Sequence, residues 1–427
     1  MQIHFANAAQ RWAFLAAVFL VAAALAFLAG KDALAEHYAH SANAEDWLRA
    51  ARLEPGNASH WARLARYRHL DFERADVPQA IRYYLRALAI DPRAAYTWTD
   101  LAGAYELAGD LPRAREAFET AEAAYPISAE VAWRYGNFLL RQEQIPQAFA
   151  EIRRGVTTDP RLAKLAISRC WRATRDIHLI LERALPPGAE VYQAALDYLV
   201  SEHETDAALV AWQRLLALEH SVELPRAFPL LDELIQNART EDARRVWKQA
   251  LAAAGLPAGG SLVWDGGFEG PFTNGGFGWR QYNLAGVSFD FDTEKRHSGS
   301  RSLRVTFDGS ANLDFQHVEQ FVPVQPNTRY RFAAHLRTDG ITTDSGVRFA
   351  IFPRGPGEKA LLTPNLIGTQ PWALDETEFT TGPQTRLVEI LLRRMPSQKF
   401  DNRIQGTVWV DDVLLTPAPP GPGRRSP

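Results

Sequence analysis

Residues 96–126 read YTWTDLAGAYELAGDLPRAREAFETAEAAYP, and this stretch decides the fold of the N-terminal half. Its apolar residues recur at the spacing of helical turns, which predicts two antiparallel helices joined by a short turn. The small residues Ala102 and Ala114 would let the two helices approach closely. The large residues Trp98 and Phe118 would fill the gap to the next pair of helices.

The same pattern recurs along the chain, and prolines give its register. Pro55, Pro92, Pro126 and Pro160 are separated by 37, 34 and 34 residues, and a tryptophan stands six residues after each of the first two. Because proline cannot continue a helix, each of them marks the end of one unit. A period of this length predicts a solenoid of helical hairpins.

These units resemble the tetratricopeptide repeat over about residues 45–255, most clearly over 58–160. The resemblance implies a helical repeat domain at 31–255, with divergent hairpins after Pro160. It also implies that a protein or peptide binds in the concave groove of the solenoid. In the clearest unit the matching residues are Trp98, Leu101, Ala102, Tyr105, Ala114, Phe118, Ala121 and Pro126.

The composition is that of an ordinary globular protein. The chain has 427 residues, of which 46% are hydrophobic and 23% charged, and this length predicts two to three domains. The net charge of −3 provides no positive field for nucleic acid. The single cysteine, Cys170, excludes an intrachain disulfide.

The N-terminus differs from the rest of the chain. Residues 12–29, WAFLAAVFLVAAALAFLA, contain no charge and are long enough to span a membrane. Residues 1–30 are therefore predicted to be a membrane anchor or a signal segment, with cleavage near Ala35 left open. Because Arg11 precedes the apolar run, we expect the N-terminus in the cytoplasm and the bulk of the chain outside it, in the periplasm or at the cell surface.

The periodicity changes after a short linker at 256–261. Runs such as RSLRVTF, RYRFAAHL and GTVWVDDVLL are rich in β-formers and are separated by Gly, Pro and Asn. They predict a β-sandwich at 262–416, followed by a Pro-rich tail at 417–427 that cannot bury a core. The predicted fold class is multidomain, α then β.

The order of motifs in this half is LVWDGGFEG, Gly278-Trp279, HSGSRSLRVTF, VPVQPNTRYRF and VWVDDVLL. In this order they resemble carbohydrate-binding modules of the family 4/9 type, which are jelly rolls of the galactose-binding-like superfold. The resemblance implies glycan binding. It covers roughly residues 262–416.

In many such modules a structural calcium ion ties the first strand, a turn and the last strand together. Hard cations prefer oxygen ligands, and backbone carbonyls count among them. Asp412 would face away from the site, because side chains alternate along a strand. A hydrogen-bond network that closes the strands is the alternative. The residues implied as calcium ligands are Asp265, Gly266, Glu269, Lys295, Ser298 and Asp411.

Sugar binding needs aromatic faces that stack on a pyranose, with polar groups beside them. The predicted glycan-binding residues are Phe272, Tyr282, Trp279 and Trp372. Trp279 and Trp372 also fit core positions of this superfold, so that both roles are open for them.

No catalytic motif accompanies these residues, and the chain is predicted not to be an enzyme. His317 and His335 lie in predicted strands, and we expect them to be surface or packing residues rather than ligands. The domain pair suggests a membrane-anchored binding protein that acts in assembly or export of cell-surface polysaccharide. One alternative is a pure protein scaffold. The other is a glycoside hydrolase that uses Glu269 and Asp411.

Overall fold

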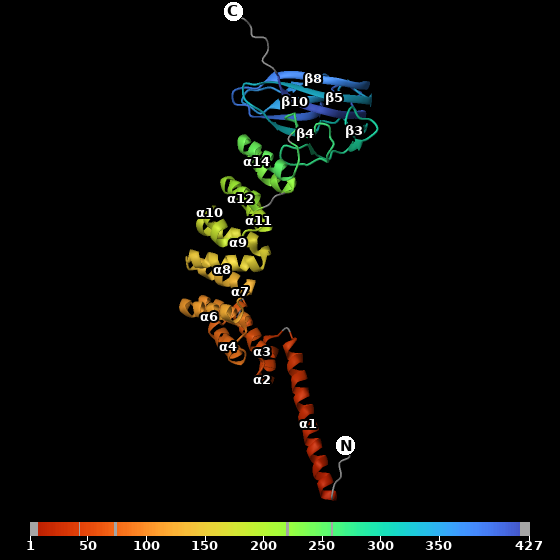
Figure 1. Ribbon diagram of the computed structural model, residues 1–427. Coiled ribbons are helices and arrows are strands. Elements are labelled where there is room, and N and C mark those ends of the chain that lie inside the picture. Colours follow the sequence, from red (N-terminus) through yellow and green to blue (C-terminus); the bar gives the residue numbers. More distant parts are fainter. Residues whose placement is uncertain (1–6, 42, 72–74, 219–221, 258, 419–427) are drawn as a thin grey trace, which may run out of the picture. The chain divides into compact units, whose positions relative to one another are not determined.

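The structure, a computed structural model, describes the chain in five segments (Figure 1), which are residues 7–41, 43–71, 75–218, 222–257 and 259–418. Contacts divide the chain into two compact units, Met1–Pro186 and Pro187–Pro427. In the described residues the first unit is helical, and the second combines helices with two antiparallel β-sheets. The predicted class, helices followed by a β-sandwich, is confirmed.

The division into units does not follow the predicted domains. The first unit ends at Pro186, and the expected linker at 256–261 lies inside the second unit. The helices over 189–253 thus belong with the sandwich. One physical reason is Trp247, whose ring lies edge-on to Trp264 and Phe277 of the β half at 5.7 and 6.0 Å. Of the predicted disordered tail, residues 419–427 lie outside the described residues.

The first unit is built from helical hairpins. Three of them, α3/α4, α5/α6 and α7/α8, correspond to the three predicted repeats. Its elements are α1 (Ala8–Ala39), α2 (Ala44–Leu53), α3 (Ala58–Leu70), α4 (Val77–Ile90), α5 (Ala95–Leu107), α6 (Leu111–Ala124), α7 (Ala129–Arg141), α8 (Ile145–Thr158), η1 (Pro160–Leu162), α9 (Ala163–Thr174), α10 (Ile177–Leu179) and η2 (Ile180–Ala184).

The spacing between proline and tryptophan has a direct cause in the structure. The indole nitrogen of Trp98 donates a hydrogen bond to the carbonyl oxygen of Pro92 at 2.9 Å. Trp61 makes the same bond to Pro55 at 3.1 Å. Each tryptophan thereby satisfies a carbonyl of the turn that follows the preceding helix, and fixes the entry of the next helix.

An ion-pair ladder links three successive repeats. Asp100 in α5 is nearly buried, and its two carboxylate oxygens accept bonds from Arg66 of the preceding repeat at 2.5 Å and Arg134 of the following repeat at 2.8 Å. The three residues are spaced 34 apart, so that they occupy the same position in each repeat. A carboxylate at this depth needs such partners, because burying an unpaired charge is costly.

Small residues allow the helices of one repeat to approach closely, as predicted. Gly136 in α7 takes the position of Ala102, and a Cβ added there would lie 2.8 Å from Cγ1 of Ile152 in α8. Between repeats, Phe118 stacks on Tyr135 with the ring centroids 5.2 Å apart.

Substitution of Gly136 by alanine should therefore destabilise the first unit by about 1–3 kcal/mol, through overpacking against Ile152. Gly155 in α8 is the matched control, because its added Cβ would meet the nearest atom at 3.4 Å. Gly155→Ala should be neutral or stabilising by up to about 1 kcal/mol, from helix propensity. Urea unfolding followed by circular dichroism measures both, and equal effects of the two changes would contradict this packing.

Helix α1 is long and apolar enough to cross a membrane, and none of its apolar window is buried. A signal sequence near an N-terminus has the same character. The structure therefore agrees with either reading of residues 1–30.

The second unit begins with helices and ends with the sandwich. Its helical elements are α11 (Ala189–Ser201), α12 (Thr205–Leu218), η3 (Leu224–Ala227), α13 (Phe228–Gln236) and α14 (Thr240–Ala253). The first sheet has the order β1 (Arg280–Gln281), β4 (Phe315–Pro323), β9 (Leu387–Arg394), β6 (Arg348–Pro353) and β7 (Leu361–Leu362). The second has the order β2 (Val287–Asp292), β3 (Ser302–Asp308), β10 (Gln405–Pro417), β5 (Arg329–Ile341) and β8 (Gly368–Thr380).

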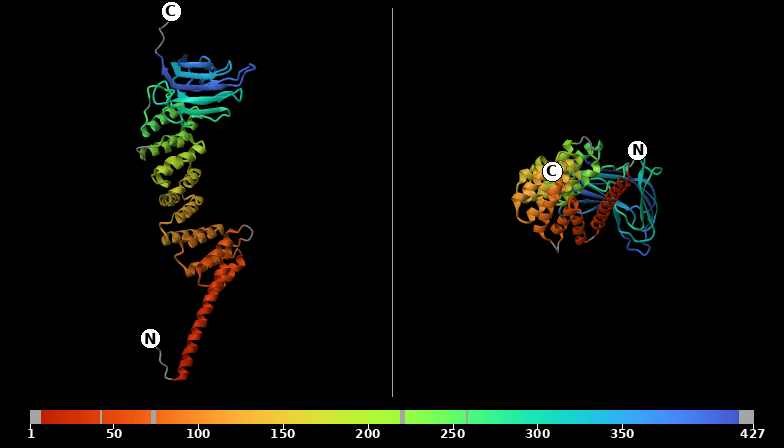
Figure 2. Two further views of the ribbon diagram at one scale, coloured as in Figure 1. Left: turned by 90° about the vertical axis from the view of Figure 1, so that its right-hand side faces the viewer. Right: turned by 90° about the horizontal axis from the view of Figure 1, so that it is seen from below.

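The two sheets pack face to face as a jelly-roll sandwich, and Figure 2 shows them as stacked layers. Alternate residues of each strand point into the core between them. On β5, for example, Phe332, Ala334 and Leu336 are fully buried while Arg331 is exposed. The core thus consists of one face of each sheet, and the other two faces are left to contact helices, turns or solvent.

Candidate functional site

The outer face of the first sheet is sheltered rather than exposed. In β9, Val388, Ile390 and Leu392 belong to the sandwich core. Alternation places Glu389 and Leu391 on the opposite face, yet both are buried. The outer face of this sheet is therefore shielded from solvent although it is turned away from the core, and we regard it as the floor of a groove.

A row of side chains runs across this floor. Glu389 of β9 pairs with Phe321 of β4 on one side and with Phe352 of β6 on the other. Two aromatic rings therefore flank one carboxylate. In the next row, Glu319 of β4 stands opposite Arg280 of β1.

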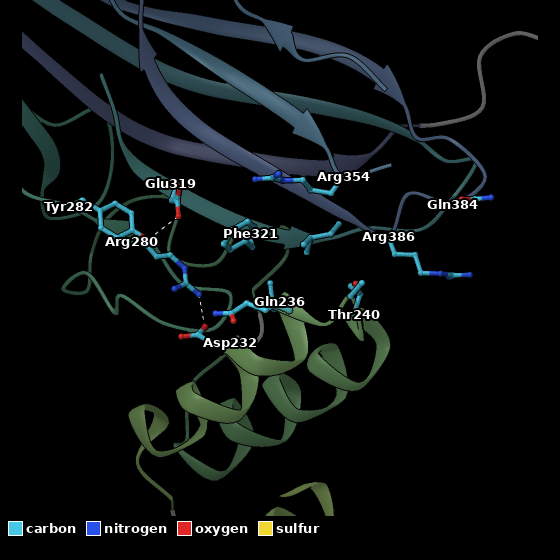
Figure 3. A pocket seen from close by; sticks show the side chains of 13 residues that line it. Asp232, Gln236, Thr240, Arg280, Tyr282, Glu319, Phe321, Arg354, Gln384 and Arg386 are labelled. Atoms are coloured by element: carbon cyan, nitrogen blue, oxygen red, sulfur yellow. Dashed lines mark hydrogen bonds and ion pairs between the residues drawn. The ribbon is translucent and has the colours of Figure 1, made fainter. Parts of the chain in front are cut away.

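Two cavities of about 480 and 490 Å³ lie over these rows. Tyr282, Glu319 and Arg354 line both of them, so that the two form one continuous groove. Figure 3 shows part of it, with Phe321 on the sheet and Gln236 and Thr240 on the helices that face it. We call this feature the first-sheet groove.

Helix α13 closes one side of the groove. The Arg280 guanidinium donates to the Asp232 carboxylate at 2.6 Å, an ion pair visible in Figure 3. The same carboxylate oxygen accepts the backbone N–H of Gly276 at 2.9 Å. A Cβ on Gly275 would lie 2.5 Å from the Phe228 ring, so that only glycine lets this loop lie against the helix.

The groove carries charge of both signs. The Tyr282 hydroxyl donates to Glu319 at 3.1 Å, and Arg354 forms an ion pair with Glu389. Burial and the nearby charge of Glu389 raise the pKa of Glu319 above its ordinary value. Burial and the carboxylate of Glu319 likewise raise the pKa of Tyr282.

The raised pKa of Glu319 predicts a pH dependence of stability. As pH rises from the ordinary value of 4.5 toward the raised one, the unfolded state releases this proton before the folded state does. The free energy of unfolding should therefore fall over that interval. In Glu319→Gln this fall should be absent, and the variant should be more stable than the native chain near neutral pH.

Urea midpoints measured between about pH 4.5 and 7 test this, since the interval starts at the unfolded value of a glutamate. The control is Glu294→Gln, at an exposed turn position. If the urea midpoint of the native chain changes with pH in parallel with that of Glu319→Gln, the pKa of Glu319 is not raised.

The structure separates the predicted glycan-binding residues. Tyr282 is 47% exposed and lies in the first-sheet groove. Trp279 is a correction: it is buried, and its indole nitrogen donates to the Asp265 carbonyl at 3.0 Å, so that no sugar can stack on it. Phe272 packs against Phe268 and Phe291. Trp372 lies in β8 of the other sheet.

The residues implied as calcium ligands do come together, as a hydrogen-bonded cluster that we call the clasp. Asp411 is fully buried, and its carboxylate accepts the backbone N–H groups of His297, Ser298 and Asp412 at 2.8, 3.1 and 2.8 Å. Burial nevertheless raises the pKa of Asp411. The clasp thus ties the last strand, β10, to the turn before β3.

Its other half lies in the WDGGFEG segment. The Glu269 carboxylate accepts the backbone N–H and the hydroxyl of Ser300. Burial alone would favour the neutral acid, but these bonds hold the pKa of Glu269 below its usual value. Asp265 accepts the N–H groups of Glu269 and Gly270, both at 2.9 Å.

Asp412 departs from the expected alternation. A β-bulge interrupts the pairing of β10 with β5 between Asp411 and Leu414, and Asp412 has a left-handed φ of 49°. As a result both acids reach the same turn: Asp412 bonds the His297 ring at 2.6 Å and the Ser298 hydroxyl at 2.6 Å. The prediction that Asp412 would face away was wrong, because a bulge adds a residue and breaks the period of two.

Oxygen atoms of the clasp already accept hydrogen bonds within the protein. The implied carbonyl ligands are already acceptors: that of Lys295 receives the Ser302 hydroxyl, and that of Gly266 receives the N–H of Val413. Among the described residues, no carboxylate oxygen of the clasp is buried without a partner. Calcium at this place stays a prediction.

We expect Asp411→Asn to lower the stability of the sandwich by about 1–3 kcal/mol, because an amide NH₂ would face N–H donors that now have an acceptor. The loss should be the same with added calcium and with chelator. Melting temperatures in both conditions measure it, with the exposed Asp401→Asn as control. A native chain stripped of metal that is stabilised by added Ca²⁺ but not by added Zn²⁺ would establish a calcium ion in the clasp.

Comparison with known families supports the repeats. The tetratricopeptide repeat family matches residues 69–126 and 108–163. These residues carry tetratricopeptide repeats. Together the two matches span residues 69–163, which include nearly all of the region 58–160 in which the pattern is strongest. No curated protein matches the chain in sequence.

Solved structures resemble the two halves separately. A "Family 16 Carbohydrate Binding Module-2" is 18% identical and covers 36% of this chain and 99% of its own, with a TM-score of 0.26. A structure described as "CBM4 structure and function" is 16% identical over 36% and 99%, with a TM-score of 0.27. "YrrB: a TPR protein with an unusual peptide-binding site" is 17% identical over 49% and 92%, with a TM-score of 0.27. At such scores these likenesses carry no argument about function.

Sequence reasoning missed most of the groove. Glu319 and Glu389 each stand inside an apolar strand, HVEQFVP and RLVEILLR, and were not singled out. An acid in the middle of such a run was the available signal, since it must point away from the core and find partners.

Proposed function

We propose that this chain is a non-catalytic binding protein whose sandwich holds a glycan in the first-sheet groove. One observation carries the proposal: Tyr282, Phe321 and Phe352 lie on one sheltered sheet face beside paired acids and guanidinium groups. Aromatic faces of this kind stack on the apolar face of a pyranose, and carboxylates and guanidinium groups bond its hydroxyls.

The polar groups of the groove are already held in place. Glu389 is fixed by Arg354, and Arg280 by Asp232. Groups that are ordered before binding lose little conformational entropy when a ligand arrives. The groove therefore suits a ligand that presents several hydroxyl groups at fixed spacing, which a polysaccharide does.

The helical repeats are proposed to bind a protein or peptide. Solenoids of this type present extended concave surfaces, and the Arg66–Asp100–Arg134 ladder gives this one a polar face that continues from repeat to repeat. Residues 12–29 are proposed to anchor the chain in a membrane, with the bulk extracytoplasmic. Together these parts fit a role in assembly or export of cell-surface polysaccharide.

Tyr282→Ala should weaken polysaccharide binding by at least about tenfold, the size expected for a central aromatic contact. The matched control is Trp372→Ala, which removes an aromatic residue from β8 of the other sheet. Binding of the full chain, in detergent, to a panel of neutral and acidic soluble polysaccharides measures both variants.

Two results would contradict the proposal. In one, the folded chain binds no polysaccharide of the panel. In the other, Trp372→Ala abolishes binding while Tyr282→Ala does not, which would move the glycan to the second sheet.

A pure protein scaffold is the second candidate. It is favoured by the contact of α13 with the groove, since Asp232 and Gln236 line the same cavity as the sheet residues. A partner protein would then bind across helix and sheet. A glycoside hydrolase finds less support, because Glu269 and Asp411, the two acids it would use, accept backbone N–H groups within the clasp, and Asp411 is fully buried.

A further inference from the structure

We propose that His297, His335 and Asp412 form a binding site for a divalent transition-metal ion of the zinc class. One ligand atom from each of these side chains lies within 4.8 Å of the others. We call them the metal triad. They stand on the outer side of the second sheet, apart from the first-sheet groove.

The three residues come from segments far apart in sequence. His335 lies on β5, Asp412 on the neighbouring strand β10, and His297 on the turn before β3. Asp411 pairs with His335 across the two strands, and the bulge that follows turns Asp412 back toward the same place. An ion here would cross-link three segments of the sandwich.

The spacing of the ligand atoms suits a tetrahedral ion. The Nδ1 atoms of His297 and His335 lie 2.6 and 3.7 Å from the same oxygen of Asp412. Ligand atoms about 2.0–2.2 Å from a tetrahedral zinc ion are roughly 3.3 Å apart, which falls between these two distances. The present hydrogen bond from His297 would give way to two metal–ligand bonds.

His335 supplies the second, independent observation. Its Nδ1 is a buried atom without a hydrogen-bond partner among the described residues. Buried polar atoms are nearly always satisfied, and each exception calls for an explanation. A lone pair on this nitrogen, aimed at the Asp412 carboxylate, is explained if a cation lies between them.

In the structure His297 and His335 stack at 3.6 Å with planes 11° apart, and Trp372 lies beside His297. Because a metal ion lies in the plane of each imidazole ligand, ion binding requires the His297 ring, on its exposed turn, to rotate out of this stack. Ser298 donates to the other oxygen of Asp412 and so fixes the direction of the carboxylate. Partners of this kind orient metal ligands in known sites.

The ligand set selects the ion. Two imidazole nitrogens and one carboxylate suit zinc and its neighbours, whereas calcium and magnesium prefer oxygen alone. Three protein ligands leave one tetrahedral position open to water or to an atom of a bound molecule, and His297 is 36% exposed on that side.

The test is titration of the full chain, stripped with chelator and kept in detergent, with Zn²⁺ by calorimetry. The expected result is one equivalent bound. A parallel Co²⁺ titration should give the intense visible absorption of a tetrahedral site. His297→Gln and Asp412→Asn should each weaken Zn²⁺ binding by at least about tenfold, since even loss of an outer-shell partner has an effect of that size.

These variants are chosen to fold. His297 lies on an exposed turn, and asparagine tolerates the left-handed backbone that Asp412 adopts. The matched control is His203→Ala, which breaks a His203–Glu233 pair at 3.0 Å that belongs to no three-ligand group in the described part of the chain. Its affinity for Zn²⁺ should equal that of the native chain.

Absence of Zn²⁺ binding below millimolar concentration would overturn the proposal. So would unchanged affinity in folded His297→Gln and Asp412→Asn. Loss of binding in Glu269→Gln, with the triad variants unaffected, would place the ion in the clasp instead. Because Tyr282→Ala leaves the second sheet untouched, it should not change the affinity for Zn²⁺, which keeps this test separate from that of glycan binding.

Discussion

The carboxylate of Asp411 sits fully buried in β10, and much of the sandwich is arranged to satisfy it. β10 is the middle strand of the second sheet, and the turn before β3 covers Asp411 there, so that its charge reaches no solvent. Three backbone N–H groups supply the compensation, two of them from the turn at His297 and Ser298. The turn must therefore close over the sheet, and the strand must bulge to aim the carboxylate. The left-handed backbone of Asp412 and the triad beside it are consequences of that one requirement.

The parts of the fold that rest on local contacts were predictable. The period of 34 residues reflects a hydrogen bond from each tryptophan to a proline carbonyl six residues earlier and a close helix contact at each small residue. Both are visible in the sequence because they lie within one repeat or between neighbours. The unit boundary was not predictable in the same way. The boundary depends on the contact of Trp247 with Trp264 and Phe277. Trp247 lies in a segment with helical periodicity, whereas Trp264 and Phe277 lie in the β half, so that neither pattern predicts the contact.

Of the first-sheet groove, the sequence predicted only a residue that lies in a single loop. Tyr282 stands in a loop beside the Gly-rich segment, and is a predicted residue that lines the groove. The floor of the groove is a row across β4, β9 and β6, and register between distant strands cannot be read from one sequence. Trp279 was misplaced because a tryptophan in a Gly-rich loop fits a platform and a core equally well until its indole partner is known. The triad was missed because alternation, applied strictly, turns Asp412 away from His335.

The two outer faces of the sandwich differ in a way that bears on function. On the second sheet, Arg331 pairs with Glu376 across β5 and β8, and both side chains are about half exposed. Such pairs are hydrated and contribute little energy, so that a ligand gains little by replacing their water. On the first sheet, the Glu389 carboxylate is buried on a floor flanked by phenylalanine rings, and only its partner Arg354 reaches solvent. Hydrogen bonds made to charged groups in such surroundings are stronger than those made in water. A polar ligand would therefore gain more energy on the first sheet, while the second sheet would offer ligand atoms for an ion where the bulge brings Asp412 to the two histidines.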